Sequence, residues 1–156
     1  MTTTEIRSQQ EAPQDSTTLT KLAIIVREGA YDRILTPLAF AYLSTAAGVH
    51  VDMLFVNWAV QAVMREESSK LAMSAEHADQ LDFVRAQVAE AGLPPDVPDI
   101  IRALKGTGMV NIYVCSLAAK IFGATRDNVM AEVDDIVGAT WFLTDKANSA
   151  DLVQTF

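Results

Sequence analysis

The stretch Lys21–Val56 (KLAIIVREGAYDRILTPLAFAYLSTAAGVHVDMLFV) decides the fold class of this chain. It opens with a β-branched apolar run at Lys21–Arg27, which is typical of a buried strand. Tyr31–Ala47 follows with apolar side chains at helical spacing, and Gly48 ends that helix. Val49–Val56 is a second buried strand by the same pattern. A strand, a helix and a strand of these lengths predict a parallel right-handed crossover.

The alternation continues towards the C-terminus. Met109–Cys115 (MVNIYVC) predicts a third strong strand, and Ser116–Phe122 predicts the helix that follows it. A short strand is expected around Ala131–Val133, then a helix capped by Asp134 or Asp135, and Asp151–Phe156 (DLVQTF) closes the chain as an edge strand. The fold class is therefore α/β, with a mostly parallel sheet of about five strands covered on both faces.

The chain divides into a tail and one domain. Residues 1–20 are rich in Thr, Ser and Gln without periodicity, so we expect a disordered polar tail before a single domain at 21–156. Residues 57–67 and 74–91 are expected to be helical, the second with Leu81, Val84 and Val88 inward. The segment 68–98 is long for a plain crossover and predicts a helical insertion, or lid, near the cysteine described below.

Composition excludes several classes of partner. Twelve basic and twenty acidic residues give a formal charge of −8, which disfavours nucleic acid and membrane surfaces. No run approaches the roughly 20 apolar residues that span a bilayer. The single Cys fits a reducing compartment, so we expect a cytoplasmic protein.

No cofactor or metal is expected from the motifs. The chain has no Cys-x-x-Cys pair, no Gly-x-Gly-x-x-Gly after its first strand and no Walker-type phosphate loop. His50 and His77 stand in a predicted strand and a predicted surface helix, without ligand-like spacing to other candidates.

Ligands of open parallel sheets bind outside the carboxyl ends of the strands. Those ends carry a charged pair (Arg27 and Glu28), an amide, an indole and a thiol, so these groups predict one polar rim. The residues expected there are Glu28, Gly29, Asn57, Trp58, Cys115 and Ser116.

Cys115 is the most informative residue of the rim. If Ser116 opens a helix, the helix dipole and the free amide groups favour the thiolate, and Lys120 one turn on adds positive charge. The alternative is a core Cys that packs as a small apolar residue. Position alone leaves both interpretations open.

Several blocks around this cysteine resemble the DsrE/DsrF-like family, especially the branch sometimes labelled peroxiredoxin-like. They are NIYVCSLAAKIFGA (111–124), GATWFL (138–143), ADLVQTF (150–156), KLAIIVREGAYDRI (21–34) and VDMLFVNWAV (51–60). The resemblance implies a three-layer Rossmann-like fold, homo-oligomers built as a trimer or a multiple of it, and a persulfide on Cys115. It also implies exchange of sulfur with small TusA-like carrier proteins. The insertion departs from the family pattern, since KLAMSAEHADQLDF (70–83) is polar and acidic.

Three functions are consistent with these sequence features. The first is a sulfur carrier or sulfurtransferase that holds sulfur on Cys115, with Lys120 and the helix amides stabilising the anion. The second is a module that binds a small ligand at the same rim without covalent chemistry. The third is an oligomeric accessory subunit with a packed Cys.

Overall fold

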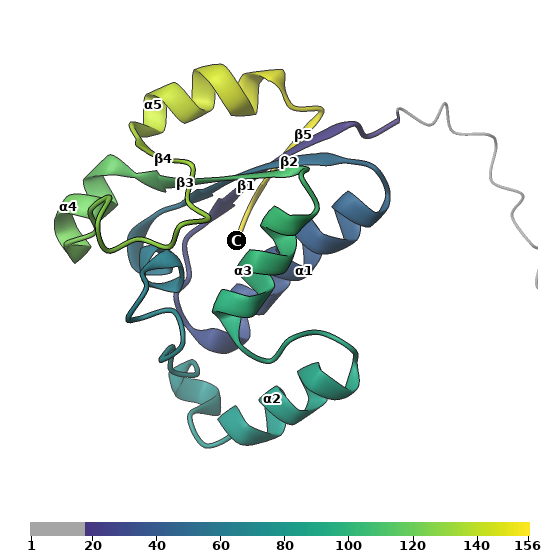
Figure 1. The fold of residues 1–156 in the computed structure, drawn as a ribbon, viewed down its shortest axis with the longest axis vertical. Coiled ribbons are helices and arrows are strands. Elements are labelled where there is room, and N and C mark those ends of the chain that lie inside the picture. Colours follow the sequence, from purple (N-terminus) through teal and green to yellow (C-terminus); the bar gives the residue numbers. More distant parts are fainter. Residues whose placement is uncertain (1–17) are drawn as a thin grey trace, which may run out of the picture.

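The computed structural model describes residues 18–156 and shows one sheet of five parallel strands. The order across the sheet is β4-β3-β2-β1-β5 (Figure 1). The strands are β1 (Lys21–Val26), β2 (His50–Phe55), β3 (Val110–Cys115), β4 (Asp135–Val137) and β5 (Leu152–Thr155). The predicted fold class is therefore confirmed, including the closing strand at the edge.

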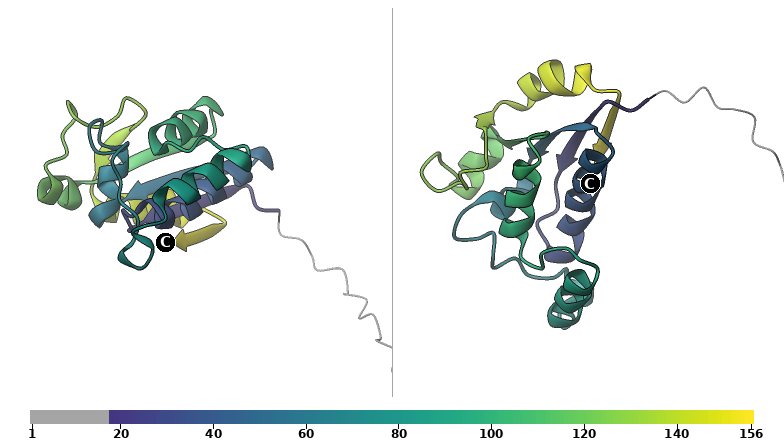
Figure 2. Two further views of the ribbon diagram at one scale, coloured as in Figure 1. Left: turned by 90° about the horizontal axis from the view of Figure 1, so that it is seen from below. Right: turned by 45° about the vertical axis from the view of Figure 1, so that its right-hand side comes forward.

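Helices cover the two faces of this sheet to make three layers. One face lies against α1 (Tyr31–Ala46) and α3 (Val97–Gly106), and the other against a single helical stretch (Figures 1 and 2). That stretch runs through α5 (Ala139–Trp141), η3 (Phe142–Lys146) and η4 (Ala147–Ser149). Five of the six residues of β2 are buried, because this strand is central and has helices on both sides.

The fourth strand lies further along the chain than the sequence suggests. Ala131–Val133 is not a strand; the neighbouring Met130 amide instead donates to the carbonyl of Val63 at 2.8 Å. Pairing with β3 begins after Asp134, whose amide donates to the Ile112 carbonyl at 2.8 Å. The last helix accordingly starts at Ala139, after the strand, rather than directly after Asp134 or Asp135.

The predicted helix at 57–67 is shorter and more tightly wound. It is the 3₁₀ helix η1 (Asn57–Val63), which buries Ala59, Val60, Ala62 and Val63 against the core. The expected long helix at 74–91 is a 3₁₀ turn, η2 (Ala75–His77), followed by α2 (Leu81–Glu90). No residue of α2 is fully buried, although Leu81 and Val84 pack partly against the core.

The insertion contacts the start of α1, which follows the carboxyl end of β1. The Tyr31 hydroxyl donates to the Pro95 carbonyl at 2.6 Å, and the Arg85 guanidinium lies 5.9 Å from the centre of the Tyr31 ring. In Figure 1, α2 lies at the bottom of the view and α4 (Ser116–Phe122) at the left. These contacts hold the insertion where β1 ends and α1 begins. A lid over Cys115 itself stays a prediction.

The predicted tail lies outside the described residues except for its end. Thr20 is fixed there: its amide and its hydroxyl both donate to the Asp151 carboxylate at 2.8 Å. None of the helices within residues 18–156 has the length and apolar character needed to cross a membrane.

Candidate functional site

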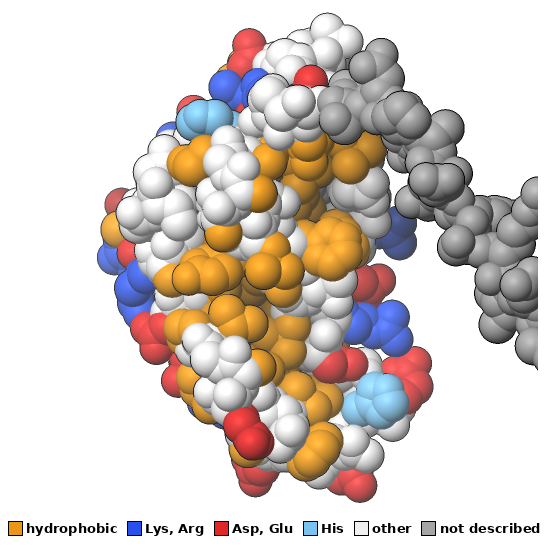
Figure 3. All heavy atoms as spheres, turned by 90° about the vertical axis from the view of Figure 1, so that its right-hand side faces the viewer, with side chains coloured by type: hydrophobic (Ala, Val, Ile, Leu, Met, Phe, Trp, Pro, Cys, Tyr) orange, Lys and Arg blue, Asp and Glu red, His pale blue; other side chains and the backbone are white. Residues whose placement is uncertain are grey.

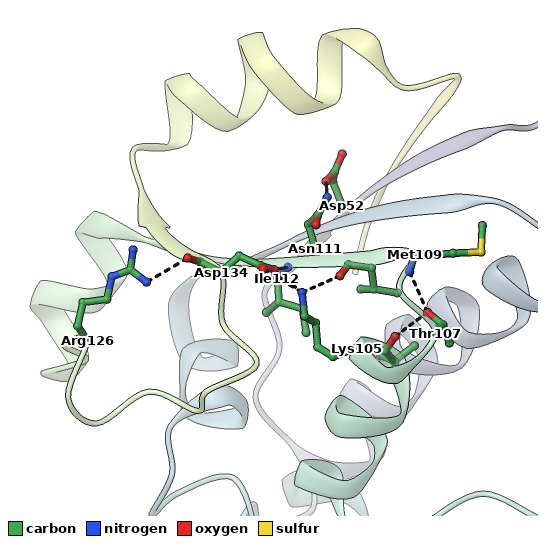
Figure 4. A network of polar contacts seen from close by, with 10 residues as sticks. Asp52, Lys105, Thr107, Met109, Asn111, Ile112, Arg126 and Asp134 are labelled. Carbon is green, nitrogen blue, oxygen red and sulfur yellow. Dashed lines mark hydrogen bonds and ion pairs between the residues drawn. The ribbon is translucent and has the colours of Figure 1, made fainter.

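A polar network anchors the strand that carries Cys115 (Figure 4). The Lys105 ammonium, near the end of α3, donates to the Asp134 carboxylate at 2.8 and 2.9 Å and to the Val110 carbonyl at 3.0 Å. The same carboxylate accepts from the Ile112 amide at 2.7 Å. One side chain thus ties α3, β3 and the start of β4 together, so the path of β3 towards Cys115 is held from both sides.

Cys115 stands at the junction that the sequence predicts. It is the last residue of β3, it pairs with Val137 of β4, and α4 begins at the next residue. The side chain is only 6% exposed and belongs to the hydrophobic core. It makes no capping hydrogen bond to α4. The thiol is therefore close to a strand end but nearly closed to solvent, which makes it less accessible than expected.

Gly29 and Trp58 meet at the carboxyl edge of the sheet. A Cβ atom built on Gly29 would lie 2.5 Å from the Trp58 carbonyl oxygen, so the loop after β1 touches the backbone after β2. The Trp58 indole packs on the Phe122 ring of α4, with 4.8 Å between centroids. Three strand-end segments are thereby joined, and the helix that follows Cys115 is one of them.

Asn57 begins this contact in an unusual conformation. Its φ of 49° makes it the one non-glycine residue with positive φ among residues 18–156. Asn tolerates the left-handed region better than most residues, so it suits a sharp turn out of β2. The turn directs the next residue, Trp58, outward, and 62% of that side chain is exposed. Asn57 thus has a positioning role that its place at the strand end alone did not reveal.

The remaining predicted residues are less closely engaged. Glu28 and Lys120 are exposed, and within residues 18–156 neither forms an ion pair. Ser116 is half-buried and shares a helix face with Lys120, four residues on. The geometry therefore joins Gly29 and Trp58 to the helix of Cys115 and leaves the two charged residues at the margin.

Sequence reasoning missed an apolar surface beside the thiol. Leu117 and Ile121 of α4 are 66% and 64% exposed, and they lie on one face of the helix because they are four residues apart. Trp58 adds a third exposed apolar side chain through its contact with Phe122. The sequence shows that Leu117 and Ile121 are four residues apart and so share a helix face. It does not show that this face points to solvent, because that depends on how α4 packs against the sheet.

Tyr113 lies on the same side of β3 as Cys115 and faces the C-terminal helical stretch. Its ring packs edge-on to Trp141 at 5.4 Å, and the Lys146 ammonium lies 5.8 Å from its centre. Burial raises the pKa of the Tyr113 hydroxyl, and the positive charge of Lys146 offsets part of that rise. The phenol therefore stays neutral at physiological pH and acts as a packing residue.

Comparisons with known proteins agree with this architecture. The model of the DsrE/DsrF-like family matches residues 20–156. A solved structure titled as a protein of unknown function, MTH1491 from Methanobacterium thermoautotrophicum, superposes with a TM-score of 0.53 at 12% identity. The alignment covers 86% of this chain and 98% of that one, and it supports the fold alone. A search of curated proteins found no match. Because the family model covers the whole sheet, its covering helices and Cys115, this chain belongs to the DsrE/DsrF-like family.

Proposed function

We propose that this protein is a sulfur carrier that holds sulfur as a persulfide on Cys115. The observation that carries the proposal is the position of the single cysteine at the end of β3, directly before α4, in a chain of the DsrE/DsrF-like family. Family membership suggests a role in sulfur relay, and Cys115 is the only thiol that can serve it.

The chemistry is a pair of sulfur exchanges. The Cys115 thiolate attacks the outer sulfur of a donor persulfide, a new S–S bond forms, and the donor leaves as a thiolate. An acceptor thiolate then attacks the outer sulfur, and the Cys115 thiolate is the leaving group. Electrons balance in both steps, so neither a cofactor nor an external oxidant is required. The protein acts as a sulfurtransferase when both partners are present.

The apolar surface of Trp58, Leu117 and Ile121 supports a protein partner. These side chains lie on or against the helix that follows Cys115, and an exposed hydrophobic patch of this kind favours protein contacts. The partner in this proposal is a small TusA-like carrier in the reducing cytoplasm. Lys120, which is exposed on the same helix, provides a contact for an acidic group on that carrier.

A second surface supports a homo-oligomer, a trimer or a multiple of it. Figure 3 shows hydrophobic side chains gathered across the face of α1 and β5. Phe40 and Leu43 of α1 and Leu152 and Val153 of β5 are 43–66% exposed. The edge strand β5 has no charged residue, although edge strands of monomers usually carry one. This face is the interface that we propose between copies of the chain.

Mass spectrometry of the intact protein tests the carrier role. The native wild type, treated with polysulfide and then freed of excess reagent, should gain the mass of one sulfur atom and lose it to added dithiothreitol. Cys115→Ser should gain nothing and should keep the native circular dichroism spectrum. A wild-type thiol that stays unmodified while the protein is native would contradict the proposal.

The burial of Cys115 favours one other function, an oligomeric accessory subunit with a packed Cys. The same experiment separates the two functions. A packed Cys should react only after denaturant unfolds the protein, whereas a carrier Cys should react in native buffer at a rate independent of global stability.

A further inference from the structure

A cavity of about 500 Å³ opens where three segments meet. The segments are the loop after η1, the start of α3, and residues 129–132. Its polar lining consists of Arg65, Ser68, Ser69, Arg102 and Glu132. The volume lies in the range of sites for small molecules.

Backbone pairing holds this cavity in shape. Met64 and Val129 form an antiparallel bridge, the Arg65 amide donates to the Asn128 carbonyl at 2.9 Å, and the Met130 amide donates to the Val63 carbonyl at 2.8 Å. The loop after η1 is thereby fastened to the 129–132 segment. The wall that carries Arg65 and Ser68 is preformed.

Ser68 places an unused hydroxyl at the cavity. The residue is only 2% exposed, and within residues 18–156 its side chain makes no hydrogen bond, whereas its amide donates to the Met64 carbonyl at 2.9 Å. No fully enclosed side-chain nitrogen or oxygen in this range lacks a partner, so the Ser68 hydroxyl must touch solvent. Since Ser68 lines the cavity, the cavity is where that contact occurs. Water can satisfy this hydroxyl in the free protein, and a ligand that enters the cavity can take the place of that water.

Two arginines line the cavity, and they differ in whether an acidic side chain already neutralises them. Arg102 is already paired with Asp99 at 2.7 Å and lies 3.8 Å from Glu132. Arg65 donates its Nε to the Val129 carbonyl at 2.8 Å, which fixes the guanidinium, and in the described part of the chain it has no acidic partner. Its terminal nitrogens therefore remain available as donors beside Ser68.

We propose that this cavity binds a small molecule bearing a phosphate group, held by Arg65 and by the hydroxyls of Ser68 and Ser69. A guanidinium and hydroxyls match the acceptor oxygens of a tetrahedral oxyanion. The cavity has more room than free phosphate fills, so a phosphate monoester fits better. The net charge of −8 disfavours non-specific binding of anions. Saturable binding of a phosphate compound would therefore indicate a specific site.

Thermal unfolding with inorganic phosphate or glycerol 3-phosphate, against chloride at equal ionic strength, tests this proposal. A bound ligand should raise the unfolding temperature along a saturating curve. We expect the monoester to saturate at lower concentration than phosphate. Arg65→Gln should weaken either ligand about tenfold or more, because a charge-assisted hydrogen bond is lost. The matched control is Arg33→Gln, which removes an exposed arginine of α1 that pairs with Glu76.

Ser68→Ala keeps the test independent of any folding defect in the Arg65 variant. Without ligand, the Ala variant should be about as stable as the wild type, because the Ser68 hydroxyl contacts solvent and has no hydrogen-bond partner within residues 18–156 that the substitution would leave unpaired. With ligand, it should show a clearly smaller shift than the wild type. Equal shifts in the wild type and both variants, or no effect beyond that of chloride, would overturn the proposal.

Discussion

Substituting Gly29 by Ala should disturb the contact that joins β1, β2 and α4. The new Cβ would lie 2.5 Å from the Trp58 carbonyl oxygen and 2.8 Å from its carbonyl carbon. Real Cβ atoms essentially never approach closer than 3.0 Å, so one of the two backbones must move. Gly29 does not have positive φ, so the expected cost is steric and not conformational. Overpacking of this kind costs about 1–3 kcal/mol.

The expected loss is measurable by chemical denaturation and by melting temperature. For a chain of this size, each 1 kcal/mol lowers the melting temperature by about 2–4 °C. Gly106→Ala is the matched control, because a Cβ at Gly106 meets nothing within 4 Å and φ there is not positive. That control should be neutral or stabilising, since Ala is favoured over Gly in a helix by up to about 1 kcal/mol.

The fluorescence of Trp58 reports the local effect. In a Trp141→Phe background, Gly29→Ala should shift the Trp58 emission, because the indole moves relative to Phe122. If Gly29→Ala leaves both the stability and this emission unchanged, the close approach of the two loops is not present in solution and the proposed joining of the rim is wrong.

Three further predictions concern other parts of the molecule. If the proposed interface forms, Leu152→Asp should abolish it and give a monomer in light scattering, whereas Phe83→Asp on α2 should not, although Phe83 is also exposed. Hydrogen bonds from the Thr20 amide and hydroxyl and from the Lys21 amide hold the pKa of Asp151 below its ordinary value. Its contribution to stability is therefore present above the ordinary carboxyl pKa and is lost as the pH falls through the lower native pKa; Asp151→Asn should remove this part of the acid dependence of unfolding. Hydrogen exchange should be faster in α2 than in β3, because α2 has no fully buried residue.

The strong elements were predictable because their sequence patterns are local. The strand that ends at Cys115 and the helix that starts at Ser116 lie where the change of periodicity places them. The three-residue strand β4 is too short for a pattern, so its position is set by Asp134 and its partners on β3. In α2, the spacing of apolar residues identified an apolar face, but spacing does not reveal how much of that face a neighbour covers.

The candidate site shows the same division. Parallel topology alone predicts that Gly29, Trp58 and Cys115 lie at the carboxyl ends of the strands. The burial of the thiol and the packing of Trp58 on Phe122 depend on contacts between distant segments, which no local pattern encodes. The outward faces of Leu117 and Ile121 became visible only once α4 had a fixed orientation.

Because β1 and β5 are parallel, the domain begins at the amino ends of the strands and finishes at their carboxyl ends. Lys21 begins β1 at the amino ends of the strands, and Phe156 follows β5 at their carboxyl ends. The Phe156 carbonyl accepts a hydrogen bond from the Arg27 amide at 2.7 Å. Its ring packs on Phe40, within the apolar face of α1 and β5. A purification tag or fluorescent protein fused after Phe156 would therefore emerge at the carboxyl ends of the strands, where Cys115 lies, and next to that apolar face. The same fusion placed at the N-terminal end of the chain precedes Lys21, where the strands start, which makes it the better design for testing the proposed sulfur loading and the proposed self-association.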